Sequence, residues 1–131
     1  MAPLRILHLI CPTGYYGAER WVLAQARHLP AEEVEAHVAA TREGGDPTPE
    51  ILERARRAGL PTHEVVLGGR FDPRGVARVA EAARAAGAQV LPPHGYKSDL
   101  LARLGGRRLG LPVISPPHGF ERALGLKLRL Y

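Results

Sequence analysis

The sequence has one cysteine, few aromatic side chains and no long apolar run, and each scarcity excludes a class of protein. With Cys11 as the only cysteine among 131 residues, the chain cannot form an internal disulfide, which fits a reducing compartment. Aromatic residues make up 5% of the chain and are not interleaved with a basic stripe, so we rank nucleic-acid binding low. No apolar stretch approaches the ~18 residues of a membrane span, and MAPLRILHLI is too short and too soon charged for a signal peptide. We therefore expect a cytoplasmic protein.

The sequence also lacks a metal-binding pattern. It contains no Asp-x-Asp, and its six histidines are scattered. We therefore expect no metal site. Four of the histidines are interpreted as core-edge or surface residues: His8, His28, His37 and His63.

What is present is the composition of one globular domain. Apolar residues are 45% and charged residues 24% of a chain whose length suits a single domain, 1–131. The formal net charge is +5, and most basic residues are arginines. Two groups of them are compatible with peripheral contact to anionic lipid at the inner membrane surface, although a solvated helix face is the commoner explanation: Arg54, Arg56 and Arg57, and Arg103, Arg107 and Arg108.

Strand and helix patterns alternate along the chain. Five mostly apolar runs are typical of strands, and each is followed by a helical pattern or an apolar-basic tail: 4–10, 35–41, 62–67, 88–91 and 111–115. Five β-then-α units predict a single α/β domain. Its Rossmann-like open parallel sheet has helices on both faces and the strand order 3-2-1-4-5. In such sheets, ligands bind beyond the carboxyl ends of the strands.

Proline and glycine mark the ends of the predicted helices. Asp72 caps and Pro73 opens the third helix, which ends at Gly87. Gly105 and Gly106 interrupt the fourth helical pattern. They predict that this helix is short or packs closely against a neighbour.

The connection after the first strand, CPTGYYGAER at 11–20, contains two glycines and two tyrosines. We expect Gly17 to adopt backbone angles barred to other residues and to let a ligand approach the amides at a helix N-terminus, where phosphate binds well. The spacing of Gly14 and Gly17 fits neither a dinucleotide-binding GxGxxG nor a P-loop. Taken alone, such a turn is usually only a tight connection.

A short repeat follows the fourth and fifth predicted strands, which end in PPHGY and PPHGF. The prolines stop each strand, because they cannot donate to a sheet ladder. The carboxyl edge of the sheet should therefore gather two matched groups of side chains beside Gly14 and Gly17: His94 with Tyr96, and His118 with Phe120. Either histidine taken alone could equally be a surface residue.

The stretch GAERWVLAQARHL resembles the Gly-Gly-Ala-Glu-Arg loop and first helix of the retaining family 4 glycosyltransferases, which have the GT-B fold. The stretch SDLLARLGGRRLGLPVI, followed by Pro-His-Gly-aromatic, is similar to the same family's fourth helix, fifth strand and histidine loop. The likeness runs over the whole chain in order. It implies the N-terminal, acceptor-binding domain of a metal-independent glycosyltransferase, of hexosyltransferase class, without a cofactor. Its partners would be a nucleotide-sugar donor and a sugar, lipid or small-molecule acceptor.

The resemblance also implies roles for individual residues. Gly14 and Gly17 would approach the donor phosphates. His118 would be catalytic, bonding the donor sugar or stabilising charge in the transition state. The remaining matched positions would contact the acceptor: Tyr16, Glu19, Arg20, His94, Tyr96 and Lys97. Glu19 and Arg20 could instead orient the loop.

The chain departs from the family pattern in three places. Tyr16 stands where the first of the paired glycines is common, Pro92 where a first histidine is frequent, and Pro116 where a threonine is usual. Nothing matches the family's donor half with its paired-glutamate motif. We therefore expect the C-terminal donor-binding domain to be absent from this chain, and the 131 residues to fold alone but to be inactive.

The alternative is a non-catalytic, flavodoxin-like single domain that binds a phosphorylated small molecule at the same edge. A response regulator would need an aspartate after the third strand, where LGGR stands at 67–70. A dehydrogenase would need an acid at the end of the second strand, where Thr41 and Arg42 stand, although Glu43 is close.

Overall fold

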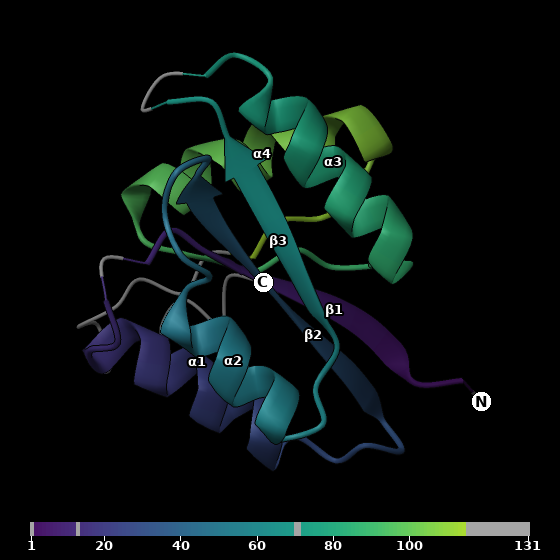
Figure 1. Ribbon diagram of the computed structural model, residues 1–131. Coiled ribbons are helices and arrows are strands. Elements are labelled where there is room, and N and C mark those ends of the chain that lie inside the picture. Colours follow the sequence, from purple (N-terminus) through teal and green to yellow (C-terminus); the bar gives the residue numbers. More distant parts are fainter. Residues whose placement is uncertain (1, 13, 70–71, 115–131) are drawn as a thin grey trace.

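The computed structural model describes residues 2–12, 14–69 and 72–114. Strands and helices alternate along this part of the chain (Figure 1). The elements are β1 (Leu4–Ile10), α1 (Gly17–His28), β2 (Val34–Glu43), α2 (Glu50–Arg57), β3 (Thr62–Leu67), α3 (Gly75–Ala86), β4 (Pro93–His94) and α4 (Tyr96–Leu109). None of the helices in these ranges is long and apolar enough to cross a membrane.

The strands form one parallel sheet in the order β3-β2-β1-β4. β1 pairs with β2 along its whole length, from Leu4 opposite Val34 to Ile10 opposite Ala40. β3 pairs along its whole length with the second half of β2. The predicted Rossmann-like sheet and the order of its first four strands are confirmed.

The fourth strand lies further along the chain than the predicted range 88–91. Val90 makes only an isolated bridge with Ile6, and the ladder with β1 is confined to β4, whose two residues pair with Leu9 and Ile10. The prediction therefore placed this strand too early and made it too long. The expectation that the prolines stop the strand is also wrong, because Pro93 is the first residue of β4.

Pro92 explains the short ladder. The Leu7 N–H donates to the Val90 carbonyl at 3.1 Å, and the Leu9 N–H donates to the Pro92 carbonyl at 3.0 Å. In this parallel register, the nitrogen of residue 92 faces the Leu7 carbonyl. Because proline has no N–H, the ladder loses one of its bonds at that point.

Residues 111–114 of the predicted fifth strand do not form a strand, and Ser115 lies outside the described residues. The Leu91 N–H donates to the Pro112 carbonyl at 3.2 Å, so this segment does run beside the fourth strand, where the fifth was predicted. In this parallel register, the nitrogen of residue 112 faces the Gln89 carbonyl, and because Pro112 has no N–H, that bond cannot form.

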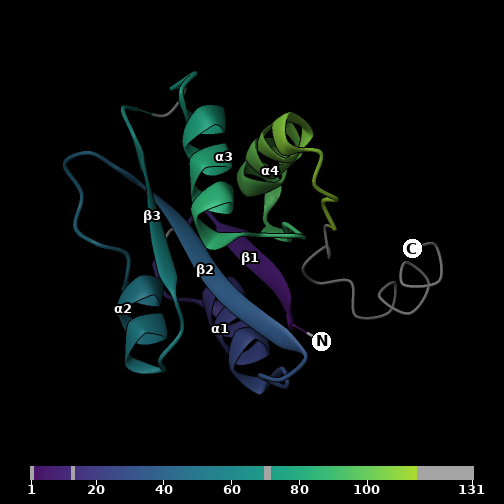
Figure 2. The same ribbon diagram turned by 90° about the vertical axis from the view of Figure 1, so that its right-hand side faces the viewer.

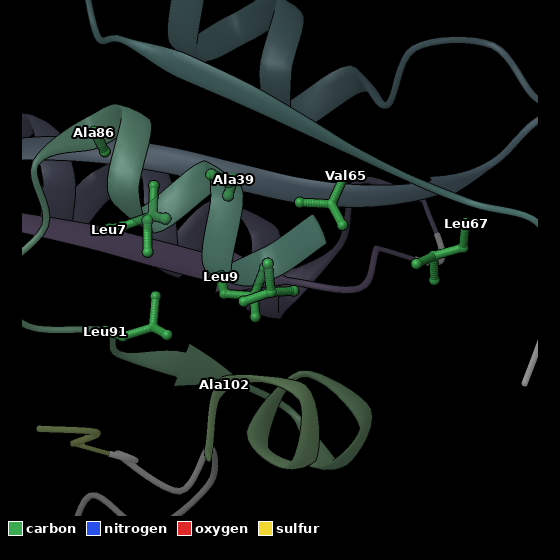
Figure 3. Packing of buried hydrophobic residues seen from close by; sticks show 11 residues of the cluster. Leu7, Leu9, Ala39, Val65, Leu67, Ala86, Leu91 and Ala102 are labelled. Carbon is green, nitrogen blue, oxygen red and sulfur yellow. The ribbon is translucent and has the colours of Figure 1, made fainter. Parts of the chain in front are cut away.

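Helices cover both faces of the sheet, α1 and α2 on one side and α3 and α4 on the other (Figures 1 and 2). Side chains of β1 to β3 point alternately to the two faces. The core under α3 and α4 includes Leu7, Leu9, Ala39, Val65, Val79 and Ala102, and Figure 3 shows most of this cluster. The core under α1 and α2 includes Ile10, Val22, Val38, Ala40, Ile51 and Leu52.

The helix ends follow the predicted glycines more closely than the predicted caps. Gly87 ends α3 with a φ of 63°, in the left-handed region that favours glycine. The start of α3, however, is Gly75 rather than Pro73. Asp72 still accepts backbone bonds, from Gly68 N at 2.7 Å and Arg74 N at 2.9 Å. These bonds lower the pKa of Asp72 to about 2.

The two glycines in the middle of α4 allow close packing without shortening the helix, which has 14 residues. A Cβ on Gly105 would lie 3.1 Å from Val79 Cγ1 of α3, and one on Gly106 would lie 2.8 Å from Val113 Cγ2. Of the two outcomes predicted for this helix, close packing is therefore the correct one.

Candidate functional site

The connections after β1 and β4 leave the sheet side by side, because Ile10 at the end of β1 pairs with His94 at the end of β4. Gly14, Tyr16 and Gly17 belong to the first connection and the start of α1. His94, Gly95 and the backbone of Tyr96 belong to the second. The carboxyl edge of the sheet thus brings these predicted site residues together. His118 and Phe120 lie outside the described residues.

The loop after β1 is fastened to α1 by Glu19. Tyr16 occupies the N-cap position of α1, and its N–H donates to Glu19 Oε2 at 3.3 Å. Glu19 is 3% exposed although it carries a carboxylate. Its side chain therefore contacts the loop rather than solvent, in the manner of one half of a capping box.

Gly14 and Gly17 serve different purposes in this loop. A Cβ on Gly14 would lie 2.5 Å from Tyr16 Cε2, so the tyrosine ring covers this glycine. A Cβ on Gly17 would have nothing within 4 Å. Neither residue has a positive φ, so the expectation that Gly17 needs unusual backbone angles is wrong. What Gly17 provides is open space at the first turn of α1, where unpaired amides lie.

The loop is also joined to α2 through Tyr15. The guanidinium of Arg54 lies 4.1 Å from the centre of the Tyr15 ring, and that of Arg20 lies 5.7 Å from it. A pocket of about 300 Å³ opens beside this ring, with Gly14 and Tyr15 on one wall and Arg42 and Glu50 on another. Arg20 therefore contacts the loop, in cation–π geometry.

His94 is not a surface residue. Its side chain is 3% exposed, and its Nε2 lies 3.0 Å from Nδ1 of His8. The ring of Trp21, from α1, meets the His94 ring edge-on, with centroids 5.3 Å apart. The His94 carbonyl accepts a bond from Ser98 Oγ at 2.6 Å, which links the residue to the first turn of α4.

His8 is a site residue that the sequence reasoning missed. It was predicted at the core edge or the surface, but it is 1% exposed, in the middle of β1. Burial lowers the pKa of His8 to about 4, so its ring is neutral at neutral pH. One signal could have revealed it. A histidine inside LRILHLI, a strand apolar enough to be buried on both faces, needs a hydrogen-bond partner in the core.

Gly95 forms the turn between β4 and α4, with a φ of 105° that side chains rarely adopt. Lys97 follows in the first turn of α4, and its charge acts on Cys11, the residue that follows β1. Burial raises the pKa of the Cys11 thiol, against a hydrogen bond with Thr41 and the charge of Lys97. The ammonium group thus adds a positive charge to the edge where Gly17 lies.

We looked for a metal site among residues 2–12, 14–69 and 72–114. No group of three or more histidine, cysteine, aspartate or glutamate side chains there could hold a metal ion. The site described in these ranges therefore consists of helix amides, a lysine and buried histidines.

The family model described as Glycosyltransferase Family 4 matches residues 15–131 of the chain. No curated protein matches this chain. Among solved structures, HepE of Anabaena in complex with UDP is similar, with 16% identity, a TM-score of 0.66 and coverage of 86% of this chain and 29% of HepE. MurG of Acinetobacter baumannii has 18% identity, a TM-score of 0.64 and coverage of 95% and 39%.

A universal stress protein in complex with cAMP is also similar, with 19% identity and a TM-score of 0.54. There the match covers 89% of this chain and 98% of the other. These likenesses show a shared fold. The chain spans well under half the length of HepE and MurG, but nearly the whole length of the stress protein.

Proposed function

The chain belongs to glycosyltransferase family 4, and on that premise we propose that it is the N-terminal, acceptor-binding domain of a retaining glycosyltransferase with a nucleotide-sugar donor. The short coverage of HepE and MurG supports this assignment, since each of those chains is long enough to hold a further domain. The UDP in the HepE structure supports a nucleotide-sugar as the donor. In a GT-B enzyme, transfer takes place in the cleft between the two domains.

The observation that carries the proposal is the open first turn of α1 at the carboxyl edge of the sheet. The space beside Gly17 is empty, and the helix N-terminus offers unpaired amides and the positive end of the helix dipole. A diphosphate could approach these amides closely. Lys97 adds positive charge near the adjacent strand end. Such groups can stabilise the departing nucleoside diphosphate without a metal ion.

The remaining roles in the proposal come from the family motif. His118 would bond the donor sugar or stabilise charge on it. Acceptor contacts would come from the turn after β4 and from the loop before α1. Because His94 is 3% exposed, its ring would not touch the acceptor directly. It would instead hold in place the turn after β4, whose residues contact the acceptor.

The donor site is tested with the full-length transferase that carries these residues. Gly17→Val should lower kcat/KM for the nucleotide-sugar about 100-fold, because its side chain would fill the space needed by the phosphates. Gly45→Val is the matched control, since Gly45 also has nothing within 4 Å of its Cβ position but lies in the β2–α2 loop. Equal losses in the two variants would contradict the proposal. Retained activity in EDTA and product with the donor's anomeric configuration are the further expected results.

The universal stress protein supports one alternative, a single domain that binds a phosphorylated small molecule at the same edge, because the match covers 98% of that protein. Calorimetry on the 131-residue chain separates the two functions. An isolated acceptor-binding domain should bind nucleotide-sugars no more tightly than millimolar, ~4 kcal/mol, since most donor contacts would come from the other domain. Micromolar binding of a nucleotide by this chain alone would favour the alternative. Sugar transfer by this chain alone would refute the half-enzyme proposal.

A further inference from the structure

A side-chain hydrogen bond joins the two strand ends that carry the candidate site. Nδ1 of His8, in β1, lies 3.0 Å from Nε2 of His94, in β4. The two rings are 1% and 3% exposed, so water cannot replace the contact. Two ring nitrogens at this distance need one hydrogen between them, and a neutral imidazole carries only one.

The surroundings of His8 decide which ring donates. Its other nitrogen, Nε2, is buried and has no hydrogen-bond partner among the described residues. If His94 donated, a neutral His8 would carry its hydrogen on Nε2, as an orphaned N–H in the core. If His8 donates from Nδ1, only a lone pair remains unpaired there. Buried orphaned N–H groups are rare in folded proteins, so His8 is the donor.

This donor assignment sets the state of His94 as well. His94 must accept at Nε2, so its ring is neutral and carries its hydrogen on Nδ1. A protonated His94 would have to donate from Nε2, which would return the orphaned N–H to His8. The contact therefore holds both rings in the Nδ1–H tautomer.

The same bond strengthens a weak part of the sheet. The β1–β4 ladder has only two pairs, and Pro92 withholds one backbone bond from it. The His94 carbonyl accepts from Ser98 Oγ, and Gly95 turns directly into α4. Movement of the His94 ring would therefore displace the turn that leads to Lys97.

We propose that His8 is a positioning residue of the candidate site, which donates from Nδ1 to Nε2 of His94 and so fixes the His94 tautomer and the turn after β4. The proposal rests on the proposed function, because that turn is where the acceptor contacts are placed. His8 itself would touch neither donor nor acceptor.

The tautomers are tested by NMR of the ring nitrogens in the uniformly ¹⁵N-labelled 131-residue chain near neutral pH. His8 and His94 should both show a protonated Nδ1 and an unprotonated Nε2. A protonated Nε2 on His94 would overturn the proposal. This measurement does not depend on sugar transfer, so it remains decisive if the proposed function is wrong.

Two substitutions at His8 separate positioning from packing. His8→Asn keeps an N–H one bond beyond Cγ, where Nδ1 stands, whereas His8→Leu removes it. His94 should keep its Nδ1–H tautomer in the Asn variant and become a mixture of tautomers in the Leu variant. If the Leu variant does not fold, His94→Gln gives a second measurement, because its side-chain oxygen can still accept and His8 should then keep its Nδ1–H signal.

The effect on the site is measured in the full-length transferase. His8→Leu should raise the acceptor KM about 10-fold with a smaller change in kcat, and His8→Asn should restore most of the loss. His63→Leu, which breaks a histidine pair on the other face of the sheet, is the matched control and should leave the acceptor KM unchanged. An unchanged KM in His8→Leu would overturn positioning while leaving the proposed function intact. Absence of any transfer by the wild-type enzyme would instead refute the proposed function.

Discussion

Two histidine pairs join neighbouring strands of this sheet at nearly the same distances, although the ring planes meet at 37° in one pair and 19° in the other. His8 and His94 link β1 to β4 at 3.0 Å, and His37 and His63 link β2 to β3 at 2.9 Å. The ring centroids are 5.2 Å apart in both pairs. The first pair lies under α1, beside Trp21, whereas the second is on the face that α3 and α4 cover. The His8–His94 pair lies closer to the carboxyl edge of the sheet, and the His37–His63 pair lies closer to the amino edge.

The pairs differ in what lies beyond them. Nε2 of His37 bonds Glu35 Oε2 at 2.9 Å, and that carboxylate also meets Arg5 at 3.3 Å. Nε2 of His8 has no partner among the described residues. A carboxylate at the end of a histidine pair stabilises positive charge on the rings, and the His37–His63 pair has such a carboxylate in Glu35. The His8–His94 pair must stay neutral, which suits a positioning role more than a proton-transfer role.

The largest expected effect of this difference is on acid stability. The pKa of His8 is lowered from 6.5 to about 4 in the folded chain, so the unfolded chain binds the extra proton between these values. The free energy of unfolding should therefore be undiminished above pH 6.5 and fall by about 3 kcal/mol as the pH drops to 4. Urea unfolding at closely spaced pH values measures this fall.

His8→Leu should remove most of that decrease, while His63→Leu should remove a smaller part. Burial lowers the pKa of His63 as well, and the neighbouring His37 adds to the effect. The pKa of Asp72 is lowered to about 2, so its contribution to the free energy of unfolding is lost mainly below pH 4. It therefore does not obscure the fall between pH 6.5 and 4. An equal fall in wild-type and His8→Leu chains would show that His8 is accessible to protons in the native state.

A second, smaller effect is the coupling energy within each pair. The double-mutant cycle of His8→Leu and His94→Leu at pH 7.5 should give about 1–2 kcal/mol, since each single change leaves a buried polar ring without its partner. The cycle of His37→Leu and His63→Leu should give less, because Glu35 and solvent can still satisfy the remaining ring. Equal coupling energies in the two cycles would remove the distinction between the pairs.

Local sequence patterns were enough to predict most of the fold. Strand β3 was predicted to its last residue, because Pro61 precedes it and a glycine pair follows. The fourth strand was misplaced because the prolines were taken to end it, whereas Pro93 lies inside β4 and pairs with Leu9. Pro92 instead withholds one N–H from the ladder with β1. Apolar periodicity cannot reveal such a loss.

The site was harder to predict than the fold. His8 and His94 are 86 positions apart, so neither residue alone signals the contact, and His8 was taken for a core-edge or surface residue. Gly17 was predicted to matter because of unusual backbone angles, which it does not adopt. What the structure shows instead is open space beside Gly17, which depends on how the loop is placed. A contact between distant segments thus accounts for the first error, and the local conformation of the loop accounts for the second.

The smallest expected effect comes from making the second pair resemble the first. Glu35→Gln keeps a hydrogen-bond acceptor beside His37 Nε2 but removes the charge. The hydrogen bond from His37 lowers the pKa of Glu35, so the acceptor beside His37 is an ionised carboxylate near neutral pH. Hydrogen bonds to ionised acceptors are about twice as strong as those to neutral ones, so the amide of the variant should hold the His37 Nε2–H less tightly. NMR near neutral pH should show a shifted Nε2 signal for His37, while the His8–His94 signals stay unchanged. Glu53→Gln makes the same charge change on the exposed face of α2 and should leave the signals of both pairs unchanged. A Glu35→Gln chain whose His37 signal matches the wild type would show that burial alone, not the carboxylate, distinguishes the two pairs.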